Sequence, residues 1–268
     1  MSATPRVTSL HVYPFKSARG ISVEAVEVDE VGLRWDRRWM LVDGNGAFMS
    51  QRTHPRMAHL RTALEAAALR VSAPGLPDLE LPYEAPPARP APLPIRVWNQ
   101  DRFMTDCGDE AAAWASGFIG MECRVVRAME PPDGPRIAAT GRIRAGFADA
   151  GPALVISEAT LADLNSRLDE PLPMNRFRPN VVVSGVPAYG EDGWGRVRIG
   201  EVLARAGWPC PRCVLTTVDQ DTGIGGREPL RTLATYRRNA KGEVEFGLNV
   251  LFEGEGVLRL GDRIEAGD

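Results

Sequence analysis

The chain has 268 residues, which suits one large domain or two modest ones. Its 32 basic and 35 acidic residues give a net charge of −3, which is untypical of a general nucleic-acid binder, so an anionic ligand must be held by a local cluster of cations. No run of about 18 apolar residues occurs, so no membrane span is expected. The N-terminus lacks the apolar core of a signal peptide, and four cysteines form no disulfide framework, so we expect a reduced, cytoplasmic protein.

Short strand-like runs dominate the first part of the chain. Apolar and polar residues alternate over 7–15 and 21–33, as they do in half-buried strands. Two further runs flank Asp43-Gly44-Asn45-Gly46, which predicts a hairpin because this kind of turn needs residues that accept a positive φ. A helix is predicted over 109–120, where apolar residues recur with helical spacing.

The second part of the chain combines strands with short helices. Ser157 is a good N-cap for a helix predicted over 157–169, and Pro229 begins another helix. Strands are predicted for the other apolar runs, including residues 214–219 directly after Cys213. Many short strands with few helices indicate a β-rich α+β fold, built as a barrel or sandwich with helical additions.

Cys210 and Cys213 form a C-x-x-C pair within "PCPRC". A thioredoxin-like dithiol opens a helix, whereas the run after Cys213 predicts a strand, and this disfavours a dithiol. A structural zinc site needs four ligands, usually in two close pairs, but Cys107 and Cys123 lie 16 positions apart. Two interpretations remain: a buried core cysteine, or a single metal-binding thiolate at Cys213 beside the cation of Arg212.

Two other stretches place cations beside polar groups. Arg176, Arg178 and Asn180 lie two positions apart. On a strand they would project from one face and offer two guanidinium groups and an amide to an anion, although a solvated strand edge is the alternative. Lys16 and Ser17 end an extended run before a glycine turn, where they form either an anion contact or an ordinary turn.

The motifs "YPFKSARG", "GLRWDRRWMLVD", "NRFRPNVVVSG" and "CPRCVLTTVDQDTG" follow one another along most of the chain. Together they resemble the MOSC superfamily, the molybdenum-cofactor sulfurase C-terminal fold. The chain is similar to the mitochondrial amidoxime-reducing component and to bacterial reductases of N-hydroxylated bases. The resemblance implies a MOSC N-terminal β-barrel-like domain over 1–120 and a MOSC β-barrel domain with a few helices over 121–268. The first strands are expected to pack into the barrel of the second half.

The resemblance also implies a cofactor and its site. The cofactor is the molybdenum cofactor, Mo-molybdopterin, a pterin dithiolene with a terminal phosphate. Cys213 would be the metal ligand and the catalytic residue, and Cys210 a bystander. Relatives carry hydroxyl residues after Asp149, whereas this chain has Ala150 and Gly151. The positions implied to bind the cofactor are Lys16, Ser17, Arg37, Asp149, Arg178, Asn180, Pro211, Arg212 and Asn249.

The function implied by the resemblance is reduction of N-hydroxylated or N-oxide substrates with electrons from a separate reductase, ferredoxin or cytochrome. Asp149 and Asp219 are each a candidate general acid or a structural turn residue. One alternative function is a sulfurtransferase that carries a persulfide on Cys213. The other is a non-catalytic module that stores or delivers the cofactor. The glycine- and proline-rich loop over 129–147 is expected to border the substrate opening. No nucleic-acid or membrane partner is expected.

Overall fold

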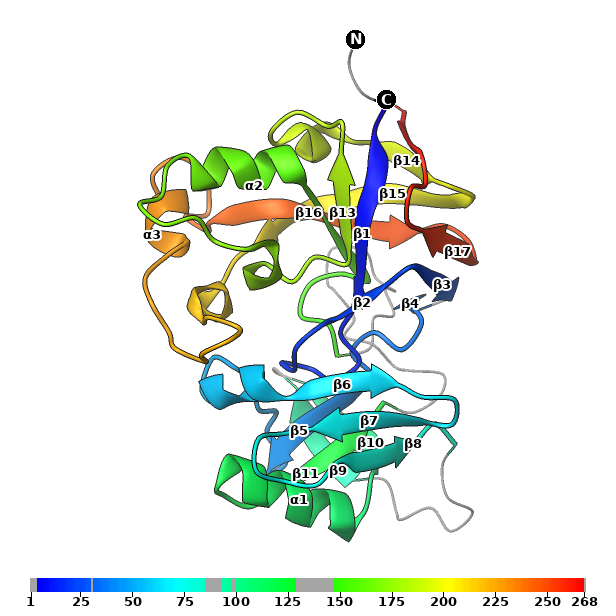
Figure 1. The fold of residues 1–268 in the computed structure, drawn as a ribbon, viewed down its shortest axis with the longest axis vertical. Helices are drawn as coiled ribbons and strands as arrows, with labels where there is room; N and C mark the ends of the chain where they lie inside the picture. The colour runs from blue at the N-terminus through cyan, green and yellow to red at the C-terminus, as the bar shows by residue number, and fades with distance from the viewer. Residues whose placement is uncertain (1–3, 30, 85–92, 98–99, 129–146, 268) are drawn as a thin grey trace.

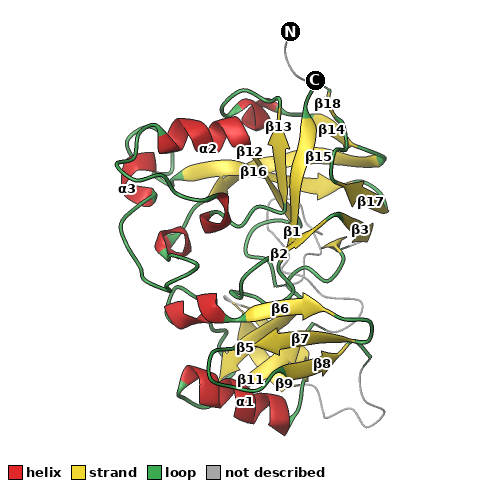
Figure 2. Cartoon of the chain, in the orientation of Figure 1, coloured by secondary structure: helices red, strands yellow, loops and turns green. Residues whose placement is uncertain are grey.

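The structure is a computed structural model that describes residues 4–29, 31–84, 93–97, 100–128 and 147–267. Two lobes are stacked along its long axis (Figure 1). Strands form most of both lobes, and the three helices that are labelled lie at their outer sides (Figure 2). The fold is β-rich α+β, as the many short strand-like runs predicted.

An eight-stranded sheet forms the upper lobe in Figure 1, with the spatial order β18-β14-β15-β16-β12-β13-β1-β2. Most neighbours are antiparallel, but β12 and β13 run parallel and are joined through helix α2 (Glu158–Asn165). The strands of this sheet are β1 (Arg6–Val12), β2 (Ile21–Val23), β12 (Ala153–Ser157), β13 (Val181–Ser184), β14 (Arg196–Ile199), β15 (Val202–Pro211), β16 (Glu245–Phe252) and β18 (Ile264–Ala266).

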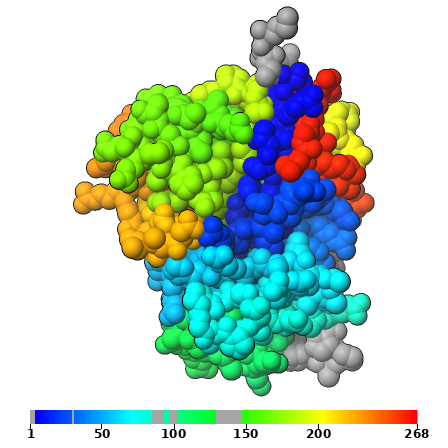
Figure 3. Space-filling model, in the orientation of Figure 1, coloured from blue at the N-terminus to red at the C-terminus, as the bar shows by residue number. Residues whose placement is uncertain are grey.

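The first strands of the chain belong to this sheet, as expected. Strand β1 pairs with β13 so that Leu10 lies opposite Val181. Figure 3 shows the N-terminal strand in blue at the surface beside the C-terminal strands in red. A small three-stranded sheet also joins the two ends of the chain. In it β3 (Ala25–Asp29) lies between β4 (Gly32–Leu33) and β17 (Gly256–Arg259). The division of the chain into domains at residue 120 remains a proposal. In both of these sheets, strands from before residue 120 pair with strands from after it.

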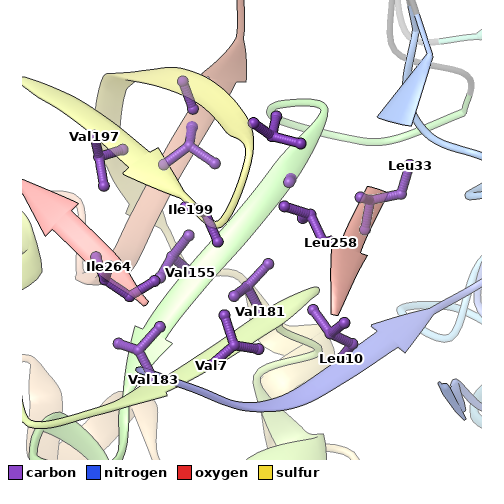
Figure 4. Packing of buried hydrophobic residues seen from close by; sticks show 14 of the residues in the cluster. Val7, Leu10, Leu33, Val155, Val181, Val183, Val197, Ile199, Leu258 and Ile264 are labelled. Atoms are coloured by element: carbon purple, nitrogen blue, oxygen red, sulfur yellow. The ribbon is translucent and has the colours of Figure 1, made fainter. Parts of the chain in front are cut away.

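Apolar side chains of these strands form the core of the upper lobe, and an irregular register between Val7 and Ser9 lets both Val7 and Leu10 face it. Val7 and Leu10 of β1 point toward Val155, Val181 and other branched side chains from the neighbouring strands (Figure 4). Nearly all of them are completely buried. Each such side chain contributes roughly 1.5–3 kcal/mol through removal of apolar surface from water. This packing fixes the end of β1 and the start of β13. Several residues that line the cavity described below lie next to these two strand ends.

The lower lobe contains two smaller sheets and helix α1 (Asp109–Ile119). The predicted helix over 109–120 is confirmed, and it ends at Gly120 in a left-handed conformation that glycine adopts readily. The predicted hairpin turn is also present, since Asp43 N donates to Ala47 O at 2.9 Å. The strands are β5 (Trp39–Asp43), β6 (Arg61–Leu64), β7 (Ala68–Ser72), β8 (Leu79–Pro82), β9 (Leu93–Val97), β10 (Gln100–Asp106) and β11 (Cys123–Arg127).

The remaining helices are short. The Ser157 side chain caps α2, because its Oγ accepts from Thr160 N at 3.0 Å, as predicted. After Pro229, helix α3 extends only over Leu230–Leu233. Four 3₁₀ turns are described, and their bounds are η1 (Pro55–His59), η2 (Met174–Arg176), η3 (Gly190–Gly193) and η4 (Val214–Thr217).

The strand predicted directly after Cys213 is wrong, because residues Val214–Thr217 form the 3₁₀ turn η4. The hydroxyl groups of Thr216 and Thr217 donate to the carbonyls of Cys213 and Val214 at 2.9 and 2.8 Å. These local bonds offer the backbone an alternative to the ladder that β-branched residues otherwise favour. Cys213 therefore lies at a strand-to-helical-turn junction.

Candidate active site

A cavity of about 360 Å³ is lined by segments that lie far apart in the sequence. All ten positions named from the sequence lie around it: Lys16, Ser17, Arg37, Asp149, Arg178, Asn180, Pro211, Arg212, Cys213 and Asn249. Residues that sequence reasoning did not select also line it, chiefly Arg52, Phe147, Leu154, Phe177, Trp208, Leu215 and Thr216.

Three of the polar lining residues have a left-handed backbone. Ser17, Arg37 and Arg178 have φ values of 65°, 51° and 55°. This region is sterically unfavourable for residues with a Cβ atom and is maintained only where the surroundings hold it. The Arg37 N–H donates to Tyr13 O at 2.8 Å, and Gln51 Nε2 donates to Ser17 O at 2.7 Å. Unfavourable backbone conformations are thus concentrated at the cavity wall.

The predicted strand face carrying Arg176, Arg178 and Asn180 is wrong in its geometry. Arg176 ends turn η2, and its guanidinium donates to Thr216 O at 3.0 Å and to Thr217 O at 2.8 Å. It does not line the cavity. Arg178 and Asn180 do line it, because the left-handed turn at Arg178 replaces the regular alternation of a strand.

Two of the cavity guanidinium groups lie over the ring of Tyr13. The centres of the Arg37 and Arg178 groups are 4.4 and 4.2 Å from the ring centroid, and both form cation–π contacts with it. The hydroxyl donates to Pro179 O at 3.0 Å. Burial raises the pKa of Tyr13 to about 12 and lowers the pKa of Arg178 to about 10. Tyr13 is therefore neutral and Arg178 charged at neutral pH.

Asn180 is almost completely buried and links both walls of the cavity. Its Oδ1 accepts from Arg37 Nη1 at 3.0 Å and from Leu154 N at 3.2 Å. Its Nδ2 donates to His11 O at 3.1 Å. Both ends of the amide are occupied, which fixes its orientation and holds Arg37 against the cavity.

Asp149 is bound by two cations. Its carboxylate forms an ion pair with the buried ammonium of Lys16, and Arg52 Nη2 donates to Asp149 Oδ2 at 2.6 Å. Burial raises the pKa of Asp149, but the two cations outweigh burial and bring the pKa below its ordinary value. Burial lowers the pKa of Lys16, and Asp149 opposes that effect. Asp149 is ionised at neutral pH.

The two cysteines of the C-x-x-C pair have different surroundings, and both are free thiols. Cys210 is buried, and Arg212 Nη1 donates to its Sγ at 3.1 Å. Cys213 is half-buried at the cavity wall, and Arg52 Nε donates to its Sγ at 3.3 Å. Because a helical turn follows Cys213, the secondary-structure argument against a dithiol no longer holds. The distinction between the cysteines now rests on their surroundings and exposure.

Asn249 and Pro211 complete the wall on adjacent strands, β16 and β15. Asn249 Nδ2 donates to Trp208 O at 3.2 Å across this pair. A Cβ atom at Gly151 would lie 3.1 Å from Asn249 Oδ1, so the small residue leaves space for the amide. Asp219, the other candidate acid, accepts from Thr222 N at 2.8 Å in a tight turn and does not line the cavity.

The charges around the cavity favour an anionic ligand. Among the described lining residues, Asp149 is the only carboxylate, whereas five lining residues are cations. The Nε atom of Arg212 is buried and has no hydrogen-bond partner within the described part of the chain. Phe147, the described end of the loop over 129–147, lines the cavity, while the rest of that loop lies outside the described residues. The five cations are Lys16, Arg37, Arg52, Arg178 and Arg212.

Two general findings concern metals and membranes. Within the residues that the structure describes, no three His, Cys, Asp or Glu side chains are grouped so that they could hold a metal ion by themselves. No helix in the described ranges is both long and apolar enough to span a bilayer.

The fold and cavity define a β-rich protein that presents one half-exposed thiol within a cationic site for an anionic ligand. Residues 4–122 match the MOSC N-terminal beta barrel domain and residues 142–265 match the MOSC domain. The chain belongs to the MOSC family.

Several relatives are similar over almost the whole chain. The mitochondrial amidoxime-reducing component 1 of Mus musculus is 39% identical over 276 residues, which cover 96% of this chain and 81% of the relative. The human component 1 is 35% identical, with 96% and 82% covered. The amidoxime-reducing component 2 of Bos taurus is 34% identical, also with 96% and 82% covered.

Arg52 is the most informative residue that the sequence did not indicate. It follows the predicted hairpin in "SQRTHPR", where no spacing distinguishes it from the neighbouring Arg56. Only the tertiary structure brings its guanidinium to Cys213 and Asp149.

Proposed function

We propose that this protein is a molybdenum-cofactor-dependent oxidoreductase that reduces N-hydroxylated or N-oxide compounds with electrons from a separate protein. The observation that carries the proposal is that one cavity is lined both by a half-exposed thiol and by five cationic side chains. The names of the relatives support the substrate class, because they are amidoxime-reducing components. The electron donor would be a reductase, a ferredoxin or a cytochrome.

The residues present fit this cofactor. A terminal phosphate needs concentrated positive charge and N–H donors, and the cavity offers them with a single competing carboxylate. The buried Nε of Arg212 is a donor without a partner in the described part of the chain, so an added acceptor would satisfy it. The metal would need one soft protein ligand, which the Cys213 thiolate can supply. We assign the contacts with the cofactor to Lys16, Ser17, Arg37, Asp149, Arg178, Asn180, Pro211, Arg212 and Asn249.

When bound, the cofactor supplies the two-electron chemistry at the N–O bond. The protein's own side chains would bind the cofactor and hold it in one orientation. Arg37 and Arg178 are held by the Tyr13 ring, so their charges are fixed before a ligand arrives. Cys210, buried against Arg212, has a packing role. Asp149 is ionised and held by two cations, so it does not act as the proton donor at neutral pH.

The first experiment measures the ratio of molybdenum to protein by elemental analysis. The chain is purified from a host that makes the cofactor, together with the Cys213→Ser and Cys210→Ser variants. We expect a nearly stoichiometric metal content in the parent and in Cys210→Ser, and little in Cys213→Ser. The parent should then reduce an aryl amidoxime with a reduced dye as electron donor. Equal metal loss in both variants would contradict the single-ligand assignment and favour a dithiol.

The same experiment separates the two alternatives. The half-exposed Cys213 thiol also suits a sulfur carrier, which would hold a persulfide and bind the cofactor only briefly. In that case the parent retains no metal, and mass spectrometry of the intact chain finds one added sulfur on Cys213. A cofactor-delivery module would retain the metal but would not turn over with the reduced dye.

A further inference from the structure

Arg52 connects the thiol of Cys213 with the carboxylate of Asp149. Its Nε lies 3.3 Å from Cys213 Sγ and its Nη2 lies 2.6 Å from Asp149 Oδ2. The side chain is only 20% exposed, and it reaches the cavity from a turn in the first half of the chain. The ammonium of Lys16 holds the same carboxylate from the other side. Positive and negative groups therefore alternate from Lys16 to the sulfur.

The turn that carries Arg52 is fixed by its neighbours. Arg52 N donates to Ser50 Oγ at 3.3 Å, and the adjacent Gln51 is completely buried. Gln51 and Gln220 exchange amide hydrogen bonds of 3.1 and 2.9 Å. Gln220 lies only a few positions after Cys213 and η4. The segment carrying Arg52 and the segment carrying Cys213 are thus joined a second time, which preorganises the contact between guanidinium and sulfur.

Resting on the proposed function, we infer that Arg52 is a positioning residue for the metal ligand: it orients the Cys213 sulfur and donates an N–H···S hydrogen bond to it. Groups that hydrogen-bond to a ligating atom orient that ligand and tune the metal. A donor to a ligating sulfur withdraws electron density, which raises the reduction potential. Arg52 lies outside all the sequence motifs that resemble the MOSC superfamily.

The guanidinium is suited to this role in a way that lysine is not. Its planar fork presents Nε and Nη2 to two partners at once, whereas an ammonium is a compact point charge. The bond from Nη2 to Asp149 restricts rotation of the planar group, so that the Nε–H stays directed at the sulfur. Arg52→Lys should therefore restore the positive charge but only part of the orientation.

The test uses the full-length chain from a cofactor-producing host, with Arg52→Gln, Arg52→Lys and the matched control Arg56→Gln. Arg56 lies four residues later in the same segment, outside the cavity, where it stacks 4.7 Å from the Phe118 ring. Metal content is measured during prolonged dialysis, and the midpoint potential of the molybdenum centre is measured by redox titration. Circular dichroism and thermal unfolding establish that each variant is folded.

For Arg52→Gln we expect about a 10-fold faster loss of molybdenum and a lower midpoint potential. Arg52→Lys should lie between that variant and the parent, and Arg56→Gln should match the parent. A folded Arg52→Gln with the retention and potential of the parent overturns the inference while leaving the proposed function in place. A parent that holds no molybdenum overturns both. A loss in Arg56→Gln equal to that in Arg52→Gln assigns the effect to general destabilisation and also rejects the role of Arg52.

Discussion

Lys16 and Asp149 lie 133 positions apart in the sequence and form an ion pair in the wall of the cavity. Lys16 Nζ also donates to Phe147 O at 2.8 Å, so the lysine organises the chain on either side of Ala148. The ammonium is buried, and among the described residues Asp149 is its only ion-pair partner. The pair therefore joins the beginning of the chain to the segment that enters strand β12.

Replacing Asp149 by Asn should destabilise the protein. The change leaves the buried Lys16 and the half-buried Arg52 without their carboxylate, and removing a charged hydrogen-bond partner costs about 2 kcal/mol. Urea unfolding of the variant and the parent measures the difference. Glu27→Gln is the matched control, since it removes an exposed pair with Arg34 and should cost less than about 1 kcal/mol. Equal costs in the two variants would refute a special role for the ion pair at the cavity wall.

The contribution of Asp149 should also depend on pH. The folded protein holds the pKa of Asp149 below its ordinary value, so the folded state favours the carboxylate. Its stabilising effect is complete above the ordinary pKa of about 4 and is lost as the pH falls through the lower, folded-state pKa. The difference in unfolding free energy between parent and Asp149→Asn should be constant between about pH 5 and 7 and should shrink in more acidic solution. A difference that grows on acidification would contradict this assignment.

Two substitutions at Tyr13 separate its hydroxyl from its ring. Tyr13→Phe loses the hydrogen bond to Pro179 O and should cost about 1 kcal/mol in unfolding free energy. Tyr13→Leu also removes the ring that Arg37 and Arg178 contact and should cost about 3 kcal/mol. Only Tyr13→Leu should lower the retained molybdenum, because only this variant frees the two guanidinium groups. Similar metal loss in Tyr13→Phe would show that the hydroxyl, not the ring, holds the site.

The cysteines should differ in reactivity toward iodoacetamide at pH 8. Burial and the neighbouring Asp106 raise the pKa of Cys107 to about 12, and burial also raises the pKa of Cys123. The reactive thiolate of Cys107 is then present at a fraction on the order of 10⁻⁴. In metal-free folded protein, peptide mapping by mass spectrometry should find Cys213 modified and Cys107 and Cys123 intact. All four should react in urea, and rapid labelling of folded Cys107 would contradict its raised pKa.

The amide pair of Gln51 and Gln220 gives a test of the coupling between the two segments. Gln51→Leu leaves the Gln220 amide and Ser17 O without their buried partners and should cost about 2 kcal/mol. Replacing both glutamines by leucine should cost less than the sum of the two single changes, because neither glutamine amide is then left facing a leucine, while Ser17 O is unpaired in both Gln51 variants. A double-mutant cycle in urea measures this non-additivity. Strict additivity would show that the pair does not act as a unit.

Much of the architecture followed from local patterns. Alternation identified β1, and the cap at Ser157 and the helix over 109–120 were correct because these signals involve residues close in sequence. The run after Cys213 was wrong because two threonine hydroxyls bond to the preceding backbone and override β-propensity. Arg176 was placed wrongly because a left-handed residue follows it, and its own carbonyl partners lie in η4.

The candidate site was predictable where a motif carried it and unpredictable where a tertiary contact did. Cys213, Lys16 and Arg178 lie in motifs, and all three line the cavity. Arg52 was missed because its role depends on a sulfur atom 161 positions away. Such a pairing leaves no periodicity or spacing in a single sequence.

The position of β1 beside β13 also determines when the large sheet can form during synthesis on the ribosome. The hydroxyl of Tyr13, just after β1, bonds to a carbonyl 166 positions later. At roughly 5–20 residues per second, the first strand waits roughly 10–30 s before its neighbour β13 has been made, whereas its other neighbour, β2, follows directly in the chain. During that interval β1 exposes an unpaired edge and its apolar face, which favours binding by a holding chaperone. A fragment ending at residue 120 would remain in this waiting state, since the strand that covers β1 is never synthesised.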